Sequence, residues 1–417
     1  MESLYAPPPV FLILSISTFT LALAFTSSRS PLRFLGLIPM LSYVPLVIGS
    51  LQMQDDSLKP IYMSVFFGGT ASMLMQYLDS ALLSRWSYEA QGPTSAAGGQ
   101  KSLRSPSDAF LRKQQSTRDA LYSRLAFGWE EAFRARYVRT PWEVNHVPKF
   151  FPERPDLLPT KTQFLYRFAQ ELLFSILFLD VIGLLGRDKS KSAIILSADR
   201  ISLITRLHDV TDEEIVVRIF ASLMHWLAIV CLLQVMYDCV AIVVISLDLG
   251  RIERWPPVFN YWGECWSIRQ FWGSFWHQTT RRKFSAPANF LCFLVLRVSK
   301  GTLVARYTLL TLTFLISGVF HRVGDMASGL KWKESGALRF FAMQAVGIMV
   351  EDIVQGTFRL IWHQDRTSAP PRGWKRALGS IWLALWLFWT TPCWNYPLVQ
   401  ITSGQSVLPF SLLERFF

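Results

Sequence analysis

Residues 11–26 read FLILSISTFTLALAFT, an apolar run without a charged side chain. Two more uncharged stretches cover residues 34–54 and 377–413. A helix needs roughly 20 predominantly apolar residues to span a bilayer. The sequence therefore predicts an integral membrane protein that crosses the bilayer several times.

The composition supports this prediction. Hydrophobic residues make up 51% of the 417 residues and charged residues only 17%, whereas a soluble domain carries about 25% charged residues. The first run lacks the basic start of a secretory signal, because Glu2 is its only early charge. We therefore expect residues 11–26 to be retained as the first membrane helix.

Hydropathy divides the chain into about eight expected spans, and the expected fold class is all-α, a polytopic bundle of transmembrane helices. The expected spans are residues 9–27, 34–54, 61–83, 164–185, 215–247, 302–321, 337–362 and 376–396. The fifth is too long for one straight crossing, so we expect it to tilt or to begin along the interface. Residues 285–300 and 397–413 are shorter apolar pieces that could be re-entrant, which is permitted only where protein covers the backbone.

Basic residues gather in alternate connections between these spans. The formal net charge is +12, and residues 84–163, 248–284 and 363–376 are rich in Lys and Arg. Cytoplasmic loops collect these residues, so we expect the three connections in the cytosol and both termini in the lumen. No nucleic-acid-binding motif accompanies the charge, so nucleic acid is not an expected partner.

The sequence suggests three parts: an N-terminal three-span segment (1–83), a basic cytosolic loop (84–163) and a membrane core (164–417). Within the loop, residues 91–107 are rich in Gly, Ser and Pro and are expected to be disordered. Residues 108–136 have apolar positions at helical spacing and are expected to form an interfacial helix. The five cysteines are scattered without a CxxC pair or zinc spacing, so no metal site is expected.

Residues 267–284 read SIRQFWGSFWHQTTRRKF and combine aromatic rings, cations and a histidine. On a helix over 269–283, Trp272 and Trp276 would share one face. One interpretation is an interfacial anchor, since Trp belts and snorkelling cations are ordinary at membrane surfaces. The other is a polyanion site, in which cations meet phosphates and rings pack on a flat heterocycle. Coenzyme A offers both features.

Residues 314–321 read FLISGVFH and place a histidine inside an apolar stretch. Ser317 lies one turn before His321 on the same face, and Gly318 removes bulk so that a substrate or a neighbouring helix can approach closely. One interpretation of His321 is a helix-end histidine that bonds a carbonyl or a lipid headgroup. The other is a general base, because titratable groups inside a span are costly and usually functional.

Five acidic residues fall inside the expected spans, and each is interpreted as pairing with an arginine or a backbone group, unless one orients a catalytic imidazole. They are Glu171, Asp180, Asp238, Glu351 and Asp352. The arginines available to them are Arg167, Arg218, Arg306 and Arg359. His225 is interpreted as a bundle histidine with satisfied hydrogen bonds, and His363 as interfacial.

The block SIRQFWGSFWHQ, followed further along by FLISGVFH, resembles the wax synthase domain, a branch related to the membrane-bound O-acyltransferases. The segment WPPVFNYW at 255–262 adds to the resemblance. Its features are similar to those of fungal members that acetylate terpenoid, meroterpenoid or trichothecene-type hydroxyls. The resemblance implies an acyl-CoA-dependent O-acyltransferase in the endoplasmic reticulum membrane, with acetyl-CoA as the expected donor and a lipophilic alcohol as the acceptor.

The resemblance also implies roles for particular residues. His321 matches the family's membrane histidine and would be the general base. His277 stands where many members carry asparagine, so it would donate a hydrogen bond or take part in proton transfer. The expected donor-binding residues are Arg269, Phe271, Trp272, Trp276, Arg281 and Arg282. Candidates for the oxyanion donor are His277 and Ser317, and the implied transfer needs no covalent enzyme intermediate.

Two alternatives stay open from the sequence. The same chemistry with long acyl chains would make wax or sterol esters, and the length of a tunnel is not readable from sequence. A transporter would instead line its pathway with Asp238, Glu351 and Asp352. Transporters often contain inverted repeats, and the two halves of this sequence show none.

Overall fold

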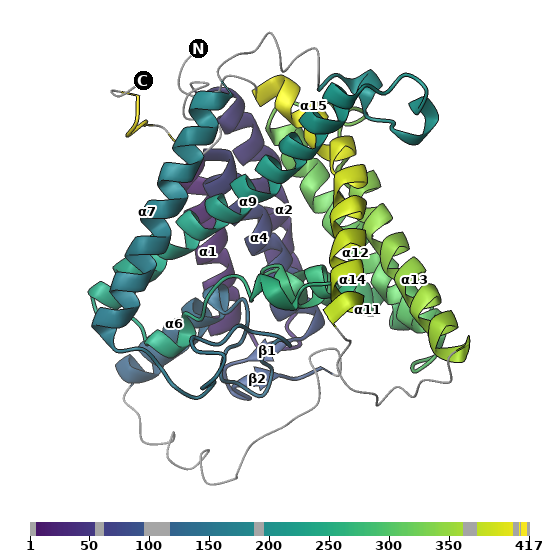
Figure 1. Cartoon of the computed structure of the whole chain (residues 1–417). Helices are drawn as coiled ribbons and strands as arrows, with labels where there is room; N and C mark the ends of the chain where they lie inside the picture. The colour runs from purple at the N-terminus through teal and green to yellow at the C-terminus, as the bar shows by residue number, and fades with distance from the viewer. Residues whose placement is uncertain are drawn as a thin grey trace. The chain divides into compact units, whose positions relative to one another are not determined.

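Helices form most of the chain (Figure 1). The structure is a computed structural model that describes residues 6–54, 62–95, 117–186, 196–361, 373–402, 408 and 410–414. Within these ranges the only sheet is a two-stranded pair, β1 (Trp86–Ser87) and β2 (Gly92–Pro93). The expected all-α fold class is therefore confirmed.

Five helices in the described residues are long and apolar enough to cross a membrane. They are α1 (Pro8–Phe25), α2 (Leu32–Gln52), α7 (Lys161–Leu185), α9 (Asp212–Ser246) and α12 (Leu303–Ala327). Each coincides with an expected span. Helix α9, with 35 residues, is the one whose length exceeds a single straight crossing.

The other three expected spans are also helical, but the count of about eight crossings is not confirmed. The third comprises three joined segments, η1 (Met63–Phe67), α4 (Gly68–Tyr77) and η2 (Leu78–Leu83). The last two correspond to α13 (Ala337–Ile361), α14 (Gly373–Thr390) and α15 (Pro392–Thr402). Charged side chains within α13 and at the start of α14 make these helices less apolar than the five above.

The chain divides into two compact units. The first comprises Met1–Gln54, Tyr62–Val144 and Thr279–Thr313, and the second comprises Asp55–Ile61, Asn145–Gln278 and Phe314–Phe417. The units interleave along the chain, so neither is one continuous segment. The three-part division suggested by the sequence stays a prediction.

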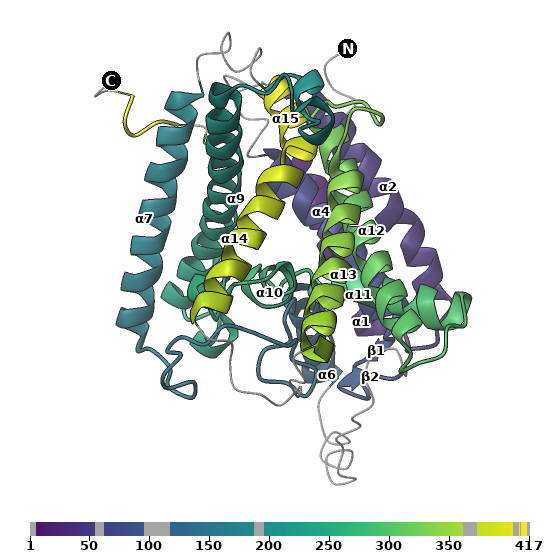
Figure 2. The ribbon, with the colours of Figure 1, turned by 45° about the vertical axis from the view of Figure 1, so that its right-hand side comes forward.

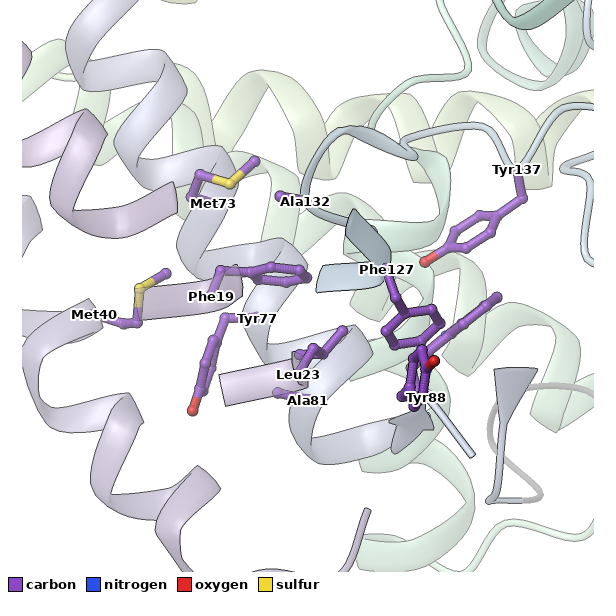
Figure 3. Packing of buried hydrophobic residues seen from close by; sticks show 11 residues of the cluster. Phe19, Leu23, Met40, Met73, Tyr77, Ala81, Tyr88, Phe127, Ala132 and Tyr137 are labelled. Atoms are coloured by element: carbon purple, nitrogen blue, oxygen red, sulfur yellow. The ribbon is translucent and has the colours of Figure 1, made fainter. Parts of the chain in front are cut away.

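The first unit packs around helix α1. Phe19 and Leu23 on α1 are fully buried, and Figure 3 shows them beside Tyr77 and Ala81. The Phe19 and Tyr77 rings meet edge to face at 6.1 Å. The Tyr77 hydroxyl donates a hydrogen bond to the carbonyl of Arg33 on α2 at 2.7 Å. Close side-chain packing and a buried hydrogen bond therefore hold these helices together. This is expected in a membrane, because lipid tails are as apolar as the helix surfaces and no hydrophobic driving force brings the helices together.

The basic connection after residue 83 contributes a hairpin to the first unit. Trp86 of β1 stacks on Tyr137 with ring centroids 4.8 Å apart and meets Trp142 edge to face at 5.1 Å. Residues 91–95 of the Gly/Ser/Pro-rich stretch belong to this hairpin, and residues 96–107 lie outside the described residues.

The helix expected within residues 108–136 is confirmed as α6 (Thr117–Phe133). It packs closely on α1, because a Cβ built on Gly128 would lie 2.4 Å from the carbonyl oxygen of Thr20. Residues 108–116 lie outside the described part of the chain, and the interfacial placement of α6 stays a prediction.

Arg282, in α11 (Arg281–Phe290), is held inside the first unit. Its Nε donates to Asp79 Oδ2 at 2.6 Å, and its Nη2 donates to the Ser84 hydroxyl at 2.9 Å. The guanidinium also lies 4.7 Å from the centre of the Tyr137 ring. Asp79 is fully buried, so this is a buried ion pair. The loss of one partner would leave the other charge buried without compensation.

The second unit contains a long antiparallel helix pair, α7 and α9, which lie side by side in Figures 1 and 2. Helix α7 begins with a capping box, in which Thr160 and Gln163 exchange side-chain-to-backbone hydrogen bonds. Lys161, at the start of α7, pairs with Asp248, just beyond the end of α9, at 2.7 Å. The start of one helix therefore meets the end of the other.

Acidic residues in this pair have polar partners, as the sequence analysis expected. Glu171 accepts from Arg167 Nε at 2.8 Å and from Gln234 Nε2 at 3.0 Å. The same Gln234 amide donates to Asp238 at 2.9 Å. Asp180 accepts two backbone N–H groups from the C-terminal segment. Pairing with an arginine or a backbone group is confirmed for Glu171 and Asp180, whereas the partner of Asp238 is the side-chain amide of Gln234.

Replacing Asp79 with alanine should lower the free energy of unfolding by about 3–5 kcal/mol, because it leaves Arg282 buried without its carboxylate. The matched control is Asp248→Ala, which removes an ion pair whose side chains are 42% and 81% exposed, and we expect a loss of about 1 kcal/mol or less. Unfolding of the detergent-purified proteins measures both. An equal effect in the two variants would contradict the structural role of the buried pair.

Candidate active site

His321 lies on α12 among aromatic rings of the second unit. Its imidazole stacks on Phe341 of α13, with ring centroids 4.7 Å apart and an interplanar angle of 9°. The indole of Trp394, on α15, meets the same imidazole at 5.0 Å and 62°. Two aromatic side chains from different helices thus fix the plane of the imidazole.

Gly318 allows α12 and α13 to approach closely at this position. A Cβ on Gly318 would lie 3.0 Å from Leu338 Cα and 3.3 Å from Phe341 Cβ. A larger residue at this position would require the neighbouring atoms of α13 to move by a few tenths of an ångström. The prediction that Gly318 permits close approach is confirmed, and the approaching group is a neighbouring helix. Figure 2 shows the two helices beside each other.

Trp394 is held by a buried carboxylate on the helix that carries His321. Its Nε1 donates to Asp325 Oδ1 at 3.1 Å, and the hydroxyl of Ser335 donates to the other oxygen of Asp325. Asp325 follows His321 by one helical turn and is 4% exposed. The orientation of Trp394 against the imidazole is therefore fixed by a hydrogen bond as well as by packing.

The aromatic block is not a single helix over residues 269–283, the arrangement considered from the sequence. The short helix α10 (Ile268–Gln270) continues into a π-helical turn, η9 (Phe271–Phe275), and the chain becomes extended at Trp276. The spacing of three or four residues between the rings is compatible with an α-helix and with a π-helical turn. The Trp272 and Trp276 rings still meet, at 5.8 Å.

Trp272 connects the block with the surroundings of His321. Its ring lies 5.7 Å from that of Phe341, the side chain that stacks on the imidazole. Its Nε1 donates to Oε1 of the fully buried Gln344 at 3.3 Å. The amide of Gln344 in turn donates to the Thr390 hydroxyl at 3.2 Å. The block and the membrane histidine therefore belong to one aromatic cluster.

Glu351 on α13 fixes the start of the block. Its carboxylate accepts the backbone N–H groups of Ile268 at 2.6 Å and Arg269 at 3.1 Å, and the Trp382 indole N–H at 3.1 Å. The first N–H groups of a helix have no partner within it, and a carboxylate is favourable there. The adjacent Asp352 accepts from Arg269 Nη2 at 2.6 Å. The expected pairing of Glu351 and Asp352 is confirmed.

Comparison with known proteins assigns this arrangement to a family. Residues 255–343, which include the block and His321, match the model described as membrane bound O-acyl transferase family. Acetyltransferase aurG of Calcarisporium arbuscula is 36% identical over 92% of this chain and 91% of its own length. This chain belongs to the membrane bound O-acyl transferase family.

Two further relatives agree with this assignment. Acetyltransferase fsoF of Humicola fuscoatra is 35% identical over 82% of this chain and 85% of its own length. Acetyltransferase atnC of an Arthrinium species is 31% identical over 77% and 71%. No solved structure matches the chain. As a member of this family the protein is an acyl-transferring membrane enzyme, which favours the acyltransferase hypothesis over a transporter.

The remaining residues of the predicted acyltransferase site fall in two places. His277 follows the block, with its ring 5.3 Å from Trp276 and 6.1 Å from Phe259. Arg281 and Arg282 belong to the first compact unit, where Arg282 binds the buried carboxylate described above. Their assignments to proton transfer and donor binding stay predictions.

Sequence reasoning missed His225 as a candidate for the acyltransferase site. Its ring meets that of Trp394 at 5.6 Å, so the same indole contacts both His225 and His321. The side chain of Asn395 bonds His225, but Nε2 is buried and meets no partner among the described residues. The prediction that this histidine is satisfied is therefore wrong. Nothing next to His225 in the sequence indicates this position, because Trp394 and Asn395 come from a distant helix.

Replacing Glu351 with alanine should reduce acyl transfer at least tenfold and lower thermal stability, because three hydrogen-bond donors lose a charged acceptor worth about 1.5–3 kcal/mol each. The matched control is the neighbouring Asp352→Ala, which removes a partly exposed ion pair and should cost about 1 kcal/mol or less. Turnover and melting temperature of the purified variants measure both effects. Full activity in Glu351→Ala would contradict its role in fixing the block.

Proposed function

We propose that this enzyme is an O-acetyltransferase that moves the acetyl group of acetyl-CoA to a hydroxyl of a lipophilic secondary metabolite such as a terpenoid. The fungal relatives named above are acetyltransferases. The observation that carries the proposal is the shared aromatic cluster, in which Trp272 of the block and the imidazole of His321 both contact Phe341.

In this proposal His321 is the general base. It removes the proton from the acceptor hydroxyl while that oxygen attacks the thioester carbonyl, and coenzyme A leaves as the thiol once the proton is transferred to sulfur. No covalent enzyme intermediate forms. A positioned base contributes about a hundredfold or more to the rate, and alignment of two reactants in a dry site contributes up to about 7–11 kcal/mol.

The donor would enter at the aromatic block, with its charged part beside Arg269 and its thioester directed past Trp272 toward Phe341. Rings and a guanidinium suit the adenine and phosphates of coenzyme A. Of the two candidate oxyanion donors, Ser317 lies one turn before the base on α12 and is 7% exposed. The other, His277, adjoins the block.

Placement in the membrane of the endoplasmic reticulum fits the two reactants. A polycyclic alcohol partitions into lipid, whereas the acyl donor dissolves in the cytosol. With the basic connections on the cytosolic side, the block would face the donor pool. The base would lie deeper, within reach of an acceptor that arrives from the bilayer.

Replacing His321 with alanine should reduce acetyl transfer by at least a hundredfold while the protein still folds, because the general base is lost and only packing against Phe341 and Trp394 is weakened. The control is His208→Ala, since the side chain of His208 is 78% exposed. Product formation from acetyl-CoA and a panel of terpenoid alcohols measures activity. Near-normal turnover in a folded His321→Ala enzyme would refute the assignment of the base.

The acyl chain length needs a separate comparison. Parallel assays with acetyl-CoA and palmitoyl-CoA, each with terpenoid, fatty and sterol alcohols, should give product predominantly from acetyl-CoA and the terpenoid panel. Predominant transfer of the palmitoyl group would assign the enzyme to wax or sterol ester synthesis instead.

A further inference from the structure

Two arginines lie at the start of the aromatic block, and each keeps a buried donor unused. Arg269 belongs to α10, and Arg376 belongs to the first turn of α14. In both, the Nε–H group is inaccessible to solvent and meets no acceptor in the described part of the chain. A buried donor without an acceptor is unfavourable, so both positions suit a ligand that brings acceptors.

The Arg376 side chain is oriented by Trp266, immediately before the block. Its guanidinium carbon lies 4.6 Å from the centre of the Trp266 ring. Helix α14 approaches this segment closely, because a Cβ on Gly379 would lie 2.2 Å from the Trp266 carbonyl oxygen. A guanidinium stacked on an indole keeps its N–H edge free for an anion. Packing thus pre-orients Arg376 beside the segment that begins the block.

Arg269 is oriented from the other helix that contacts this segment. Its Nη2 donates to Asp352 on α13 at 2.6 Å, which leaves Nε unused. The neighbouring carboxylate of Glu351 is occupied by two backbone N–H groups and the Trp382 indole. Asp352 therefore neutralises part of one guanidinium, and no carboxylate of the described residues pairs with Arg376.

The charge at the start of α14 also favours an anion. Its first turn contains Arg376 and no acidic residue. The N-terminal end of a helix carries partial positive charge, so cations there are unfavourable and an anion is stabilising. Two independent observations, the unused donors and the charge pattern, thus indicate the same class of ligand.

We propose that Arg376 and Arg269 bind a phosphate group of the acyl-CoA donor, with Trp266 holding Arg376 in place. This proposal rests on the proposed acetyl-CoA-dependent function and adds an anchor on α14 that lies outside the block. Guanidinium groups bind phosphate through paired, charge-assisted hydrogen bonds. The anchor would hold the nucleotide end of the donor while its thioester extends along the aromatic cluster.

The test compares three acetyl donors in the full-length enzyme: acetyl-CoA, acetyl-dephospho-CoA and acetyl-pantetheine. In Arg376→Gln we expect the KM for acetyl-CoA to rise about tenfold or more, the usual effect of losing a charged hydrogen bond, with kcat nearly unchanged. Turnover of acetyl-pantetheine, which lacks the nucleotide, should stay the same. If dephospho-CoA shows the same rise, the anchored group is the diphosphate; if it does not, the group is the 3′-phosphate.

Lys375→Gln is the matched control, because it removes one positive charge from the position next to Arg376. The Lys375 ammonium lies over the rings of Phe358 and Trp374. We expect its KM for acetyl-CoA to change less than twofold to threefold, within the general effect of a screened charge. Should Arg376→Gln fail to fold, Arg376→Lys keeps the charge without the planar fork and should raise the KM partially.

Three results would overturn the anchor: an unchanged KM in Arg376→Gln, an equal change in Lys375→Gln, or an equal loss with acetyl-pantetheine. Failure of the proposed function would look different, because wild-type enzyme would then acetylate no alcohol with any donor. If the wild-type enzyme acetylates no alcohol, equilibrium binding of free coenzyme A to the wild type and to Arg376→Gln still tests the anchor. Equal affinities of the two proteins for coenzyme A would overturn the anchor.

Discussion

The arrangement of the candidate active site depends on one helix, α13, and on the carboxylate that it places under the aromatic block. Glu351 holds the first N–H groups of the block, Gln344 accepts the indole N–H of Trp272, and Phe341 stacks on His321. Positions 341 and 351 on an α-helix are about 15 Å apart along its axis. A rigid helix of this length fixes the separation between the block and the imidazole, because side chains of α13 position both groups.

Much of this site was predictable from particular residues. The spacing of FLISGVFH placed His321, Ser317 and Gly318 on one helix, and Gly318 indeed meets α13. Acids inside apolar helices require partners, and Glu351 and Asp352 have them. The resemblance of the two motifs to an acyltransferase domain agreed with the family of the chain. These features are local, or follow from the high cost of polar groups in apolar surroundings.

The parts that could not be predicted are formed by contacts between distant segments. Trp394 and Asp325 shape the surroundings of His321 through a hydrogen bond between α15 and α12, and no local pattern encodes it. The same holds for the ion pair of Arg282 with Asp79, because the two residues lie far apart in the sequence and no local pattern links them. The π-helical turn of the block was not predictable because ring spacing alone does not distinguish it from an α-helix. The Glu351 carboxylate that binds the N–H groups just before the turn comes from a distant helix.

The central claim is that a water-soluble thioester and a lipid-soluble alcohol meet at His321 along a path lined by Trp272 and Phe341. The most direct measurement is a cryo-EM structure of the enzyme with a non-transferable thioether analogue of acetyl-CoA. The account predicts the acyl end about 3–4 Å from the acceptor position at the His321 imidazole, with the pantetheine arm passing Trp272. An acyl end bound elsewhere, or continuous protein between the block and the imidazole in that complex, would contradict it.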